Sequence, residues 1–98
     1  MTRLFAVVRD QTGDFDHGRP LEEQREWTAH ATFMDALTEE GFFVLVGPLE
    51  GTHTVLLIVR ANDADEIARR LADDPWTHNG MLRTLWIAPW TLRIGALP

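Results

Sequence analysis

The sequence predicts an α+β fold in which an antiparallel sheet carries two helices on one face. Three observations support this fold class. The predicted segments follow one another as strand, helix, strand, strand, helix, strand. Two of them repeat their apolar residues with the helical period of about 3.6 residues, whereas the others are short runs of strand formers between turn residues. The length of 98 residues suits a single domain over residues 1–98 with one hydrophobic core.

The chain opens with a predicted strand and a predicted helix. Residues 3–9 are rich in strand-forming residues and run into a long loop over residues 10–20 that contains glycine and aspartate. Pro20 is a suitable entry to a helix, and the apolar residues of segment 21–40 recur with the helical period. Gly41 follows this segment and is expected to end the helix.

A hairpin is predicted next. Residues 42–46 are all apolar and are followed by Gly47-Pro48, which is expected to stop the strand. A second apolar run covers residues 52–61, and a turn containing Gly51 separates the two. The two runs are short and lie close in sequence, so they indicate an antiparallel pair.

The last two segments complete the pattern. Asn62 or Asp63 can cap a second helix, Glu66 is placed to complete a capping box, and the helix is expected to stop before Pro75. Residues 82–93 then form a final strand, in which a proline requires an edge position or a bulge. This order of elements is that of the ferredoxin-like βαββαβ fold.

The predicted strands lack the alternation expected of a sheet with one face in water. Residues 42–46 and 55–59 are apolar at every position, and residues 85–90 are nearly so. Helices can cover only one face, and the chain has no further elements for the other. We therefore expect a homodimer through the sheet faces, which would form a dimeric α/β barrel. The alternative is a monomer that tolerates exposed apolar side chains.

Composition excludes several classes of function. The net charge is −6, the chain contains no lysine, and its arginines are scattered, so a nucleic-acid-binding surface is not expected. The absence of cysteine excludes a disulfide framework and a thiolate nucleophile. The apolar runs are too short to span a membrane or to form a signal peptide. A soluble, cytoplasmic protein without a cofactor or a metal is expected.

His30 is the residue whose position most needs explanation. In helical register it lies in the middle of an apolar face formed by Trp27, Ala31, Phe33, Met34 and Leu37. An imidazole can act as a general acid or base near neutral pH, and a carboxylate beside it would fix its tautomer. Asp74, just before Pro75, is the favoured partner, and Asp73 is the rival. The alternative is that His30 is a hydrogen-bonded core residue.

The other histidines carry weaker hypotheses. His17 lies between aspartates in the long loop, where a metal-binding loop or a flexible surface turn are the two interpretations. His53 precedes a predicted strand, and His78 follows Asp74 at a distance that a turn could bridge. No metalloprotease, phosphate-loop or nucleophile-elbow motif occurs in the sequence.

Five features together resemble the YCII-related (YciI-like) family of small dimeric α/β-barrel proteins. They are a histidine on the first helix, the glycine that ends it, a Gly-Pro pair after the second strand, Asp-Pro-aromatic after the second helix, and a Pro-aromatic pair in the last strand. In this sequence they are His30, Gly41, Gly47-Pro48, Asp74-Pro75-Trp76 and Pro89-Trp90. The resemblance covers about residues 1–94.

The resemblance implies a function for these residues. The family's His and Asp are regarded as an active site, and a characterised member is a dehydrochlorinase acting on a chlorinated hydroxyquinol. Carried over, His30 would transfer a proton and Asp74 would orient it. The expected substrate-binding residues are Trp27, Met34, Gly47, Pro48 and Trp76. The leading hypothesis is a cofactor-independent elimination or isomerisation of a small cyclic or aromatic compound. The alternative is a non-catalytic protein that binds a small molecule or acts as an accessory subunit.

Overall fold

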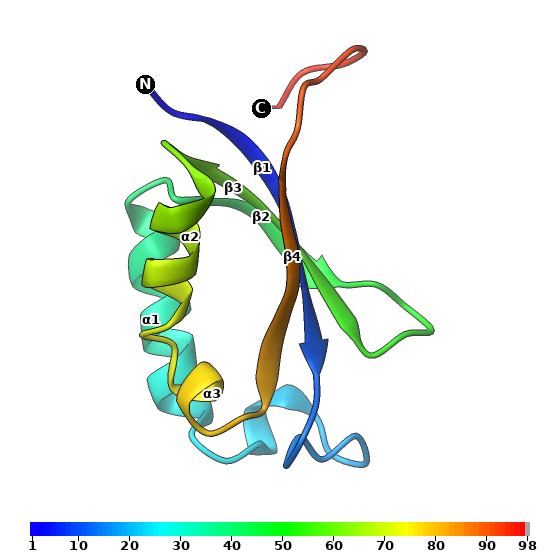
Figure 1. Ribbon diagram of the computed structural model, residues 1–98. Helices are drawn as coiled ribbons and strands as arrows, with labels where there is room; N and C mark the ends of the chain where they lie inside the picture. The colour runs from blue at the N-terminus through cyan, green and yellow to red at the C-terminus, as the bar shows by residue number, and fades with distance from the viewer. Residues whose placement is uncertain (98) are drawn as a thin grey trace.

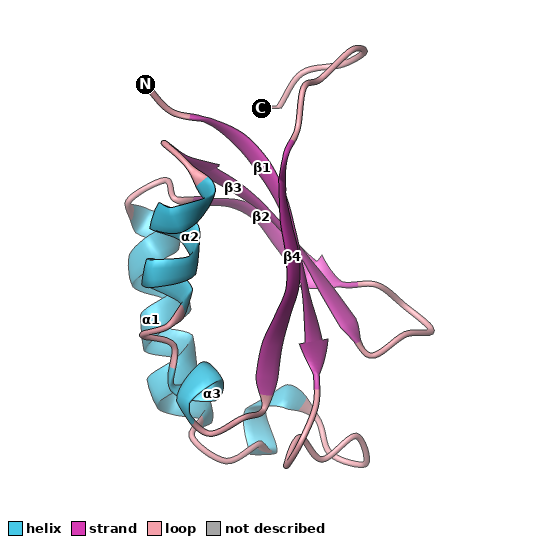
Figure 2. Cartoon of the chain, in the orientation of Figure 1, coloured by secondary structure: helices cyan, strands magenta, loops and turns pink. Residues whose placement is uncertain are grey.

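The computed structural model describes residues 1–97 and confirms the ferredoxin-like α+β fold. Four antiparallel strands form one sheet in the order β2-β3-β1-β4, and the α-helices all lie on the same side of it (Figures 1 and 2). The elements are β1 (Arg3–Gln11), a 3-10 helix η1 (Leu21–Glu23), α1 (Trp27–Glu39), β2 (Phe43–Pro48), β3 (Thr54–Ala61), α2 (Ala64–Leu71), α3 (Pro75–His78) and β4 (Leu82–Pro89).

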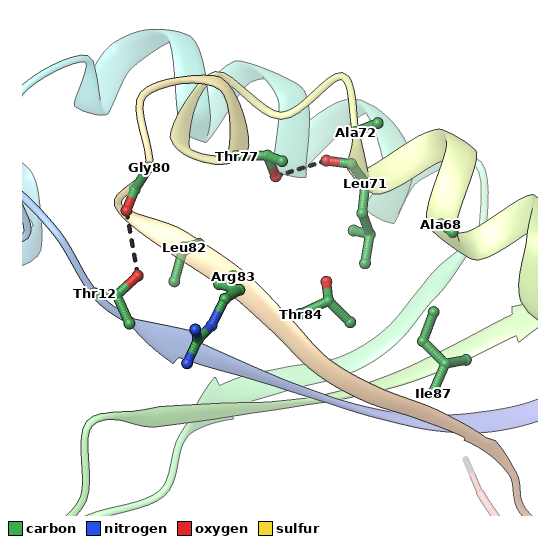
Figure 3. A pocket seen from close by; sticks show the side chains of 10 residues that line it. All are labelled: Thr12, Ala68, Leu71, Ala72, Thr77, Gly80, Leu82, Arg83, Thr84 and Ile87. Carbon is green, nitrogen blue, oxygen red and sulfur yellow. Dashed lines mark hydrogen bonds between the residues drawn. The ribbon is translucent and has the colours of Figure 1, made fainter.

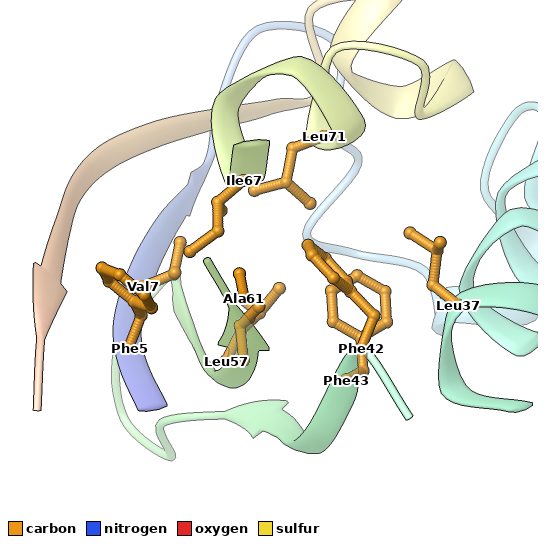
Figure 4. Close-up of a cluster of buried hydrophobic side chains, with 10 residues drawn as sticks. Phe5, Val7, Leu37, Phe42, Phe43, Leu57, Ala61, Ile67 and Leu71 are labelled. Atoms are coloured by element: carbon orange, nitrogen blue, oxygen red, sulfur yellow. The ribbon is translucent and has the colours of Figure 1, made fainter. Parts of the chain in front are cut away.

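The core lies between the sheet and the helices (Figure 4). In the central pair of strands Phe5 is opposite Val59 and Val7 is opposite Leu57, and all four side chains are buried. Because side chains alternate along a strand, the next position of β1 on this same face is Arg9. The sheet therefore directs a charged side chain into the protein interior.

The prediction of one helix over residues 21–40 is wrong at its beginning. A 3-10 helix forms first, and α1 starts only at Trp27, because Glu26 adopts a left-handed backbone conformation with φ of 61° that an α-helix cannot contain. The buried Gln24 side chain is used instead to bind the backbone of Asp16 and Arg19 in the preceding loop. The helix ends as predicted, with Gly41 at a φ of 85°.

Other boundaries also differ from prediction, and one short helix is additional. Strand β2 continues through Gly47 and Pro48, which is possible because β2 is an edge strand, where a missing proline N–H breaks no sheet hydrogen bond. Strand β4 ends at Pro89, before the predicted end at residue 93, and it is also an edge strand. The short helix α3 was not predicted. None of the helices within residues 1–97 combines the length and apolar character needed to cross a membrane.

The outer face of the sheet is apolar, as the lack of alternation predicts. Ala6 is paired with Ile58, and Val8 is paired with Leu56 on one side and Trp86 on the other. Within the described residues no helix covers this face (Figure 2). Trp86 is 49% exposed.

Asp63 is expected to stabilise the fold by capping α2. Its Oδ1 accepts a hydrogen bond of 2.8 Å from the Glu66 N–H, and Glu66 Oε1 accepts one of 2.8 Å from the Asn62 N–H. Replacing an N-cap aspartate by alanine costs about 1 kcal/mol. We expect Asp63→Ala to lower the free energy of unfolding by that amount in urea denaturation. Asp65→Ala, in the same turn but not the N-cap, should cost clearly less, and equal losses would contradict the capping role.

Candidate active site

Asp74 is held at the start of α3 by the sequence Asp74-Pro75-Trp76. Pro75 occupies the first helical position, where its missing N–H is not needed. Asp74 is the N-cap residue, and its Oδ1 accepts a hydrogen bond of 2.9 Å from the Trp76 N–H. The carboxylate is 0% exposed, whereas its neighbour Asp73 is exposed. The local helix start thus fixes the direction of one of the two candidate carboxylates and turns it into the protein.

His30 meets this carboxylate from α1. The His30 Nδ1 and Asp74 Oδ1 atoms lie 2.8 Å apart, and the histidine is 7% exposed. The imidazole is stacked on the indole of Trp76, with ring centroids 3.8 Å apart and an angle of 6° between the planes. Trp76 is fixed in turn by its Nε1–H, which donates to the Arg25 carbonyl at 2.8 Å. The stacking on Trp76 therefore fixes the plane of the His30 ring, and the hydrogen bond to Asp74 fixes the position of its Nδ1 atom.

Arg9 is the third member of the site, and the sequence analysis did not identify it. It comes from β1 and is 1% exposed. Its Nη1 donates to Asp74 Oδ2 at 2.9 Å, and its Nη2 donates to Thr77 Oγ1. The signal that could have identified it is the alternation along β1, which places residue 9 on the same face as Phe5 and Val7.

The electrostatics of the three residues define the proton arrangement. Burial alone would raise the pKa of Asp74, but hydrogen bonds from His30 and the Trp76 N–H, together with the charges of His30 and Arg9, hold that pKa below its usual value. The carboxylate is therefore ionised and can only accept hydrogen bonds. His30 must then carry a proton on Nδ1, and in the neutral ring Nε2 is the nitrogen with a free lone pair.

A cavity of about 240 Å³ lies beside the His30 ring. Its walls come from β1, η1, α1, β2, β3, α3 and the start of β4, so it occupies the space between one end of the sheet and the helices. The lining residues are Arg9, Gln11, Leu21, His30, Met34, Val46, Gly47, Pro48, Val55, Leu57, Trp76 and Leu82. Most of these are apolar. Asp74 is fully buried and is not among them.

The structure brings most, but not all, of the predicted site residues to the cavity. His30, Met34, Gly47, Pro48 and Trp76 line the cavity. Trp27 does not, because its indole packs instead with a buried cluster that includes Phe15, Trp76, Met81 and Leu82. The expected contact of Trp27 with a ligand is therefore not supported by its position.

The remaining histidines lie apart from this site. His17 and His53 are exposed and stacked on each other, with ring centroids 3.8 Å apart, so the long loop packs against the β2–β3 hairpin. His78 is exposed on α3. Within residues 1–97 no group of three or more potential metal ligands is present, so the loop around His17 has no support as a metal site.

A larger groove of about 440 Å³ lies between α2, α3 and the edge strand β4 (Figure 3). Thr77 forms part of its wall and connects it to Arg9 by the hydrogen bond described above. His30 does not line this groove. We place the candidate site in the smaller cavity because that cavity contains the imidazole.

The fold agrees with the comparison with protein families. The model of the YCII-related domain matches residues 5–91, so the chain belongs to the YCII-related family. A similar solved structure is 5-chloro-2-hydroxyhydroquinone dehydrochlorinase (TftG) from Burkholderia phenoliruptrix in complex with 2,5-dihydroxybenzoquinone. Its TM-score is 0.67 at 21% identity, covering 90% of this chain and 93% of that chain, a likeness that shows the fold. The comparison with curated proteins found no match.

Asp74→Asn is expected to lower the free energy of unfolding by about 3 kcal/mol near neutral pH, because it leaves the buried Arg9 charge without a counter-ion. The pKa of Asp74 is lower in the folded protein than in the unfolded chain, so the ionised carboxylate stabilises the fold above about pH 4. That stabilisation is lost as the pH falls through the folded-state pKa.

The difference between wild type and Asp74→Asn should accordingly shrink below about pH 4 in denaturant titrations. Asp73→Asn is the matched control, because residue 73 is exposed on the same turn, and it should change stability little at any pH. A constant difference between wild type and Asp74→Asn across the acid range would contradict the role of the ionised carboxylate.

Proposed function

We propose that the protein is a small cofactor-independent enzyme in which His30 and Asp74 move a proton on a small cyclic or aromatic compound. The observation that carries this proposal is the orientation of His30. One ring nitrogen is bound to a buried ionised carboxylate, and the ring itself lines a cavity. A general base requires a fixed tautomer and an oriented ring, which the hydrogen bond to Asp74 and the stacking on Trp76 support, and we propose that Nε2 is the nitrogen that meets the substrate.

The reaction that fits best is an elimination of the dehydrochlorinase type. His30 Nε2 would accept a proton from the substrate, the electrons of the broken bond would form a new double bond, and chloride would leave with the electrons of its own bond to carbon. Asp74 would stabilise the resulting imidazolium through Nδ1. Membership of the YCII-related family and the fold shared with a dehydrochlorinase support this reaction class. An isomerisation would use the same proton transfer without a leaving group.

The size of the cavity supports a ligand with one ring. A cavity of about 150 Å³ already accommodates benzene, and typical drug-sized ligands occupy sites of about 300 Å³ or more. The cavity of about 240 Å³ lies between these values and therefore fits a single substituted ring. The apolar side chains of Met34, Val55 and Leu57 can contact the faces of such a ring, and Trp76 offers an aromatic surface.

His30→Gln is expected to lower the turnover number by about 10²- to 10⁴-fold, the usual contribution of general acid-base catalysis. The assay measures chloride release from 5-chloro-2-hydroxyhydroquinone, the substrate named for the similar structure. His78→Gln is the matched control, because His78 is exposed on α3 and should leave turnover unchanged.

Two results would contradict this proposal. If His30→Gln folds, as judged by circular dichroism, and releases chloride as fast as wild type, His30 is not the general base. If wild type binds single-ring compounds in its cavity but converts none of a panel of chlorinated hydroxybenzenes, the protein is a small-molecule-binding protein. The second outcome corresponds to the non-catalytic alternative.

The apolar outer face of the sheet supports a homodimer formed by two sheets packed face to face. Exposed patches of this kind on soluble proteins usually mark an interaction surface. On the outer face, the apolar side chains of Ala6, Leu56 and Trp86 remain at least partly exposed on β1, β3 and β4, beside the buried Val8 and Ile58. Leu45, at 50% exposure, extends this apolar face over β2. Each sheet would then be covered by helices on one side and by the partner's sheet on the other.

Sedimentation equilibrium should give a mass twice the 11.2 kDa of one chain. Trp86→Glu should convert the protein to monomers, because it places a charge on the apolar face, beside Val8 of the central strand β1. Leu49→Glu is the control, because Leu49 is also partly exposed but lies in the turn between β2 and β3. A wild-type monomer at all concentrations, or an equal effect of the two substitutions, would contradict this dimer.

A further inference from the structure

The residue that precedes α1 has a backbone conformation that glutamate rarely adopts. Glu26 lies in the left-handed region, with φ of 61° and ψ of 25°, and it is the one non-glycine residue with a positive φ among those that the structure describes. In this conformation Cβ crowds the following carbonyl oxygen, so glycine adopts it far more easily than glutamate. Residues held in such conformations persist only where their surroundings fix them, and they cluster at functional sites.

The contacts that fix Glu26 come from α3 and the residues after it. Glu26 Oε2 accepts a hydrogen bond of 2.7 Å from Asn79 Nδ2, and Asn79 Oδ1 accepts one of 3.0 Å from the Met81 N–H. The preceding carbonyl, that of Arg25, accepts the 2.8 Å hydrogen bond from the indole of Trp76. Two successive residues before α1 are therefore bound to α3 and to its C-cap residue, Asn79.

This connection determines where α1 begins and how it presents His30. The His30 N–H donates to the Glu26 carbonyl at 3.0 Å, so the strained residue directly supports the backbone of His30. Glutamate otherwise favours the helical conformation. A helical Glu26 would let α1 extend toward residue 21 and would free its beginning from α3. The 2.8 Å contact of His30 Nδ1 with Asp74 Oδ1 joins these same two helices and depends on their relative position.

We propose that Glu26 and Asn79 are positioning residues that keep the His30 ring in one orientation toward Asp74 and the cavity. Neither is among the described residues that line the cavity, so they would act through the start of α1. This inference rests on the proposed function, in which His30 transfers a proton, and adds the contact that fixes the helix carrying it. A displacement of about 1 Å from the productive geometry can cost about a hundredfold in rate.

Glu26→Gly separates positioning from stability. Glycine adopts the left-handed conformation without strain but offers no acceptor to Asn79. Its urea midpoint should be close to that of wild type, because relief of the strain offsets the lost hydrogen bond and the greater freedom of unfolded glycine. In NMR spectra of the His30 ring, the Nδ1 proton should exchange with water about fivefold faster, the factor expected for one lost hydrogen bond. In the chloride-release assay kcat should fall by a similar factor, with KM unchanged.

Exchanging donor and acceptor gives a second test. Asn79→Asp places two carboxylates side by side and should speed the exchange of the His30 Nδ1 proton at least as much as Glu26→Gly does. Glu26→Gln keeps an acceptor oxygen for Asn79 and should behave like wild type. Combining Glu26→Gln with Asn79→Asp restores the hydrogen bond with donor and acceptor reversed, and slow exchange should return. Glu23→Gly, at an exposed glutamate of η1, is the matched control and should leave the His30 ring unchanged.

Four results would overturn the inference. The first is a His30 ring that populates both tautomers in wild type. The second is a Glu26→Gly variant whose ring exchange equals that of wild type, or whose kcat does where wild type is active. The third is a double variant that folds without recovering slow exchange. The fourth is failure of both Glu26→Gly and the double variant to fold, which would make the contact structural. If only one of them folds, that one decides the question.

These outcomes are distinct from failure of the proposed function. Faster ring exchange in Glu26→Gly, in a protein that turns over no substrate, retains the positioning role and removes the proposed catalysis. Turnover that is lost in His30→Gln but unchanged in Glu26→Gly removes the positioning role alone.

Discussion

The carboxylate of Asp74 is the group on which the arrangement of the site depends. Its two oxygens accept hydrogen bonds from Arg9 on β1, from His30 on α1 and from the backbone N–H of Trp76 on α3. A buried ionised carboxylate is strongly unfavourable unless it is paired and hydrogen-bonded, so the three donors and the acceptor require one another. The helices and the central strand are thereby fixed relative to each other at the end of the sheet where the cavity lies. The geometry that orients the imidazole is the same geometry that satisfies the buried charge.

Much of the fold could be predicted from the sequence because the fold depends on periodic patterns. The apolar runs and the helical period identify the strands and helices, and the absence of alternation identifies an apolar outer face. What could not be predicted depends on single residues. Glu26 adopts a left-handed conformation that starts α1 later than the period indicates, and a non-glycine residue gives no warning of this in the sequence. Asp74, by contrast, was favoured over Asp73 from the sequence because it directly precedes Pro75, and the structure places it at the N-cap of α3.

The candidate site was predicted only in part, because it also depends on single residues. His30 stands out in the sequence because it is polar on an apolar helix face, whereas Arg9 follows an apolar strand and looks like the charged residue that ends it. Alternation along β1 places Arg9 on the buried face, but alternation alone does not show whether a carboxylate lies close enough to pair with the guanidinium. That partner, Asp74, lies 65 positions away in sequence. Trp27, one helical turn from His30, was predicted to contact a ligand, but its indole packs against a buried cluster and does not line the cavity, although Trp76 and Leu82 of that cluster do.

The two interpretations of His30, a packed core residue and a proton-transfer group, describe different edges of the same ring. The Nδ1 edge has the properties of a core residue: it is hydrogen-bonded to a buried acceptor, and the ring is stacked on Trp76. His30 also lines a cavity that a small molecule can occupy. A purely structural histidine would gain nothing from a cavity beside it, because an unfilled space removes favourable packing contacts. The cavity, lined by hydrocarbon except at Gln11, Arg9 and His30, is therefore the feature that packing alone does not explain, and a ligand with one polar edge and one apolar body accounts for it.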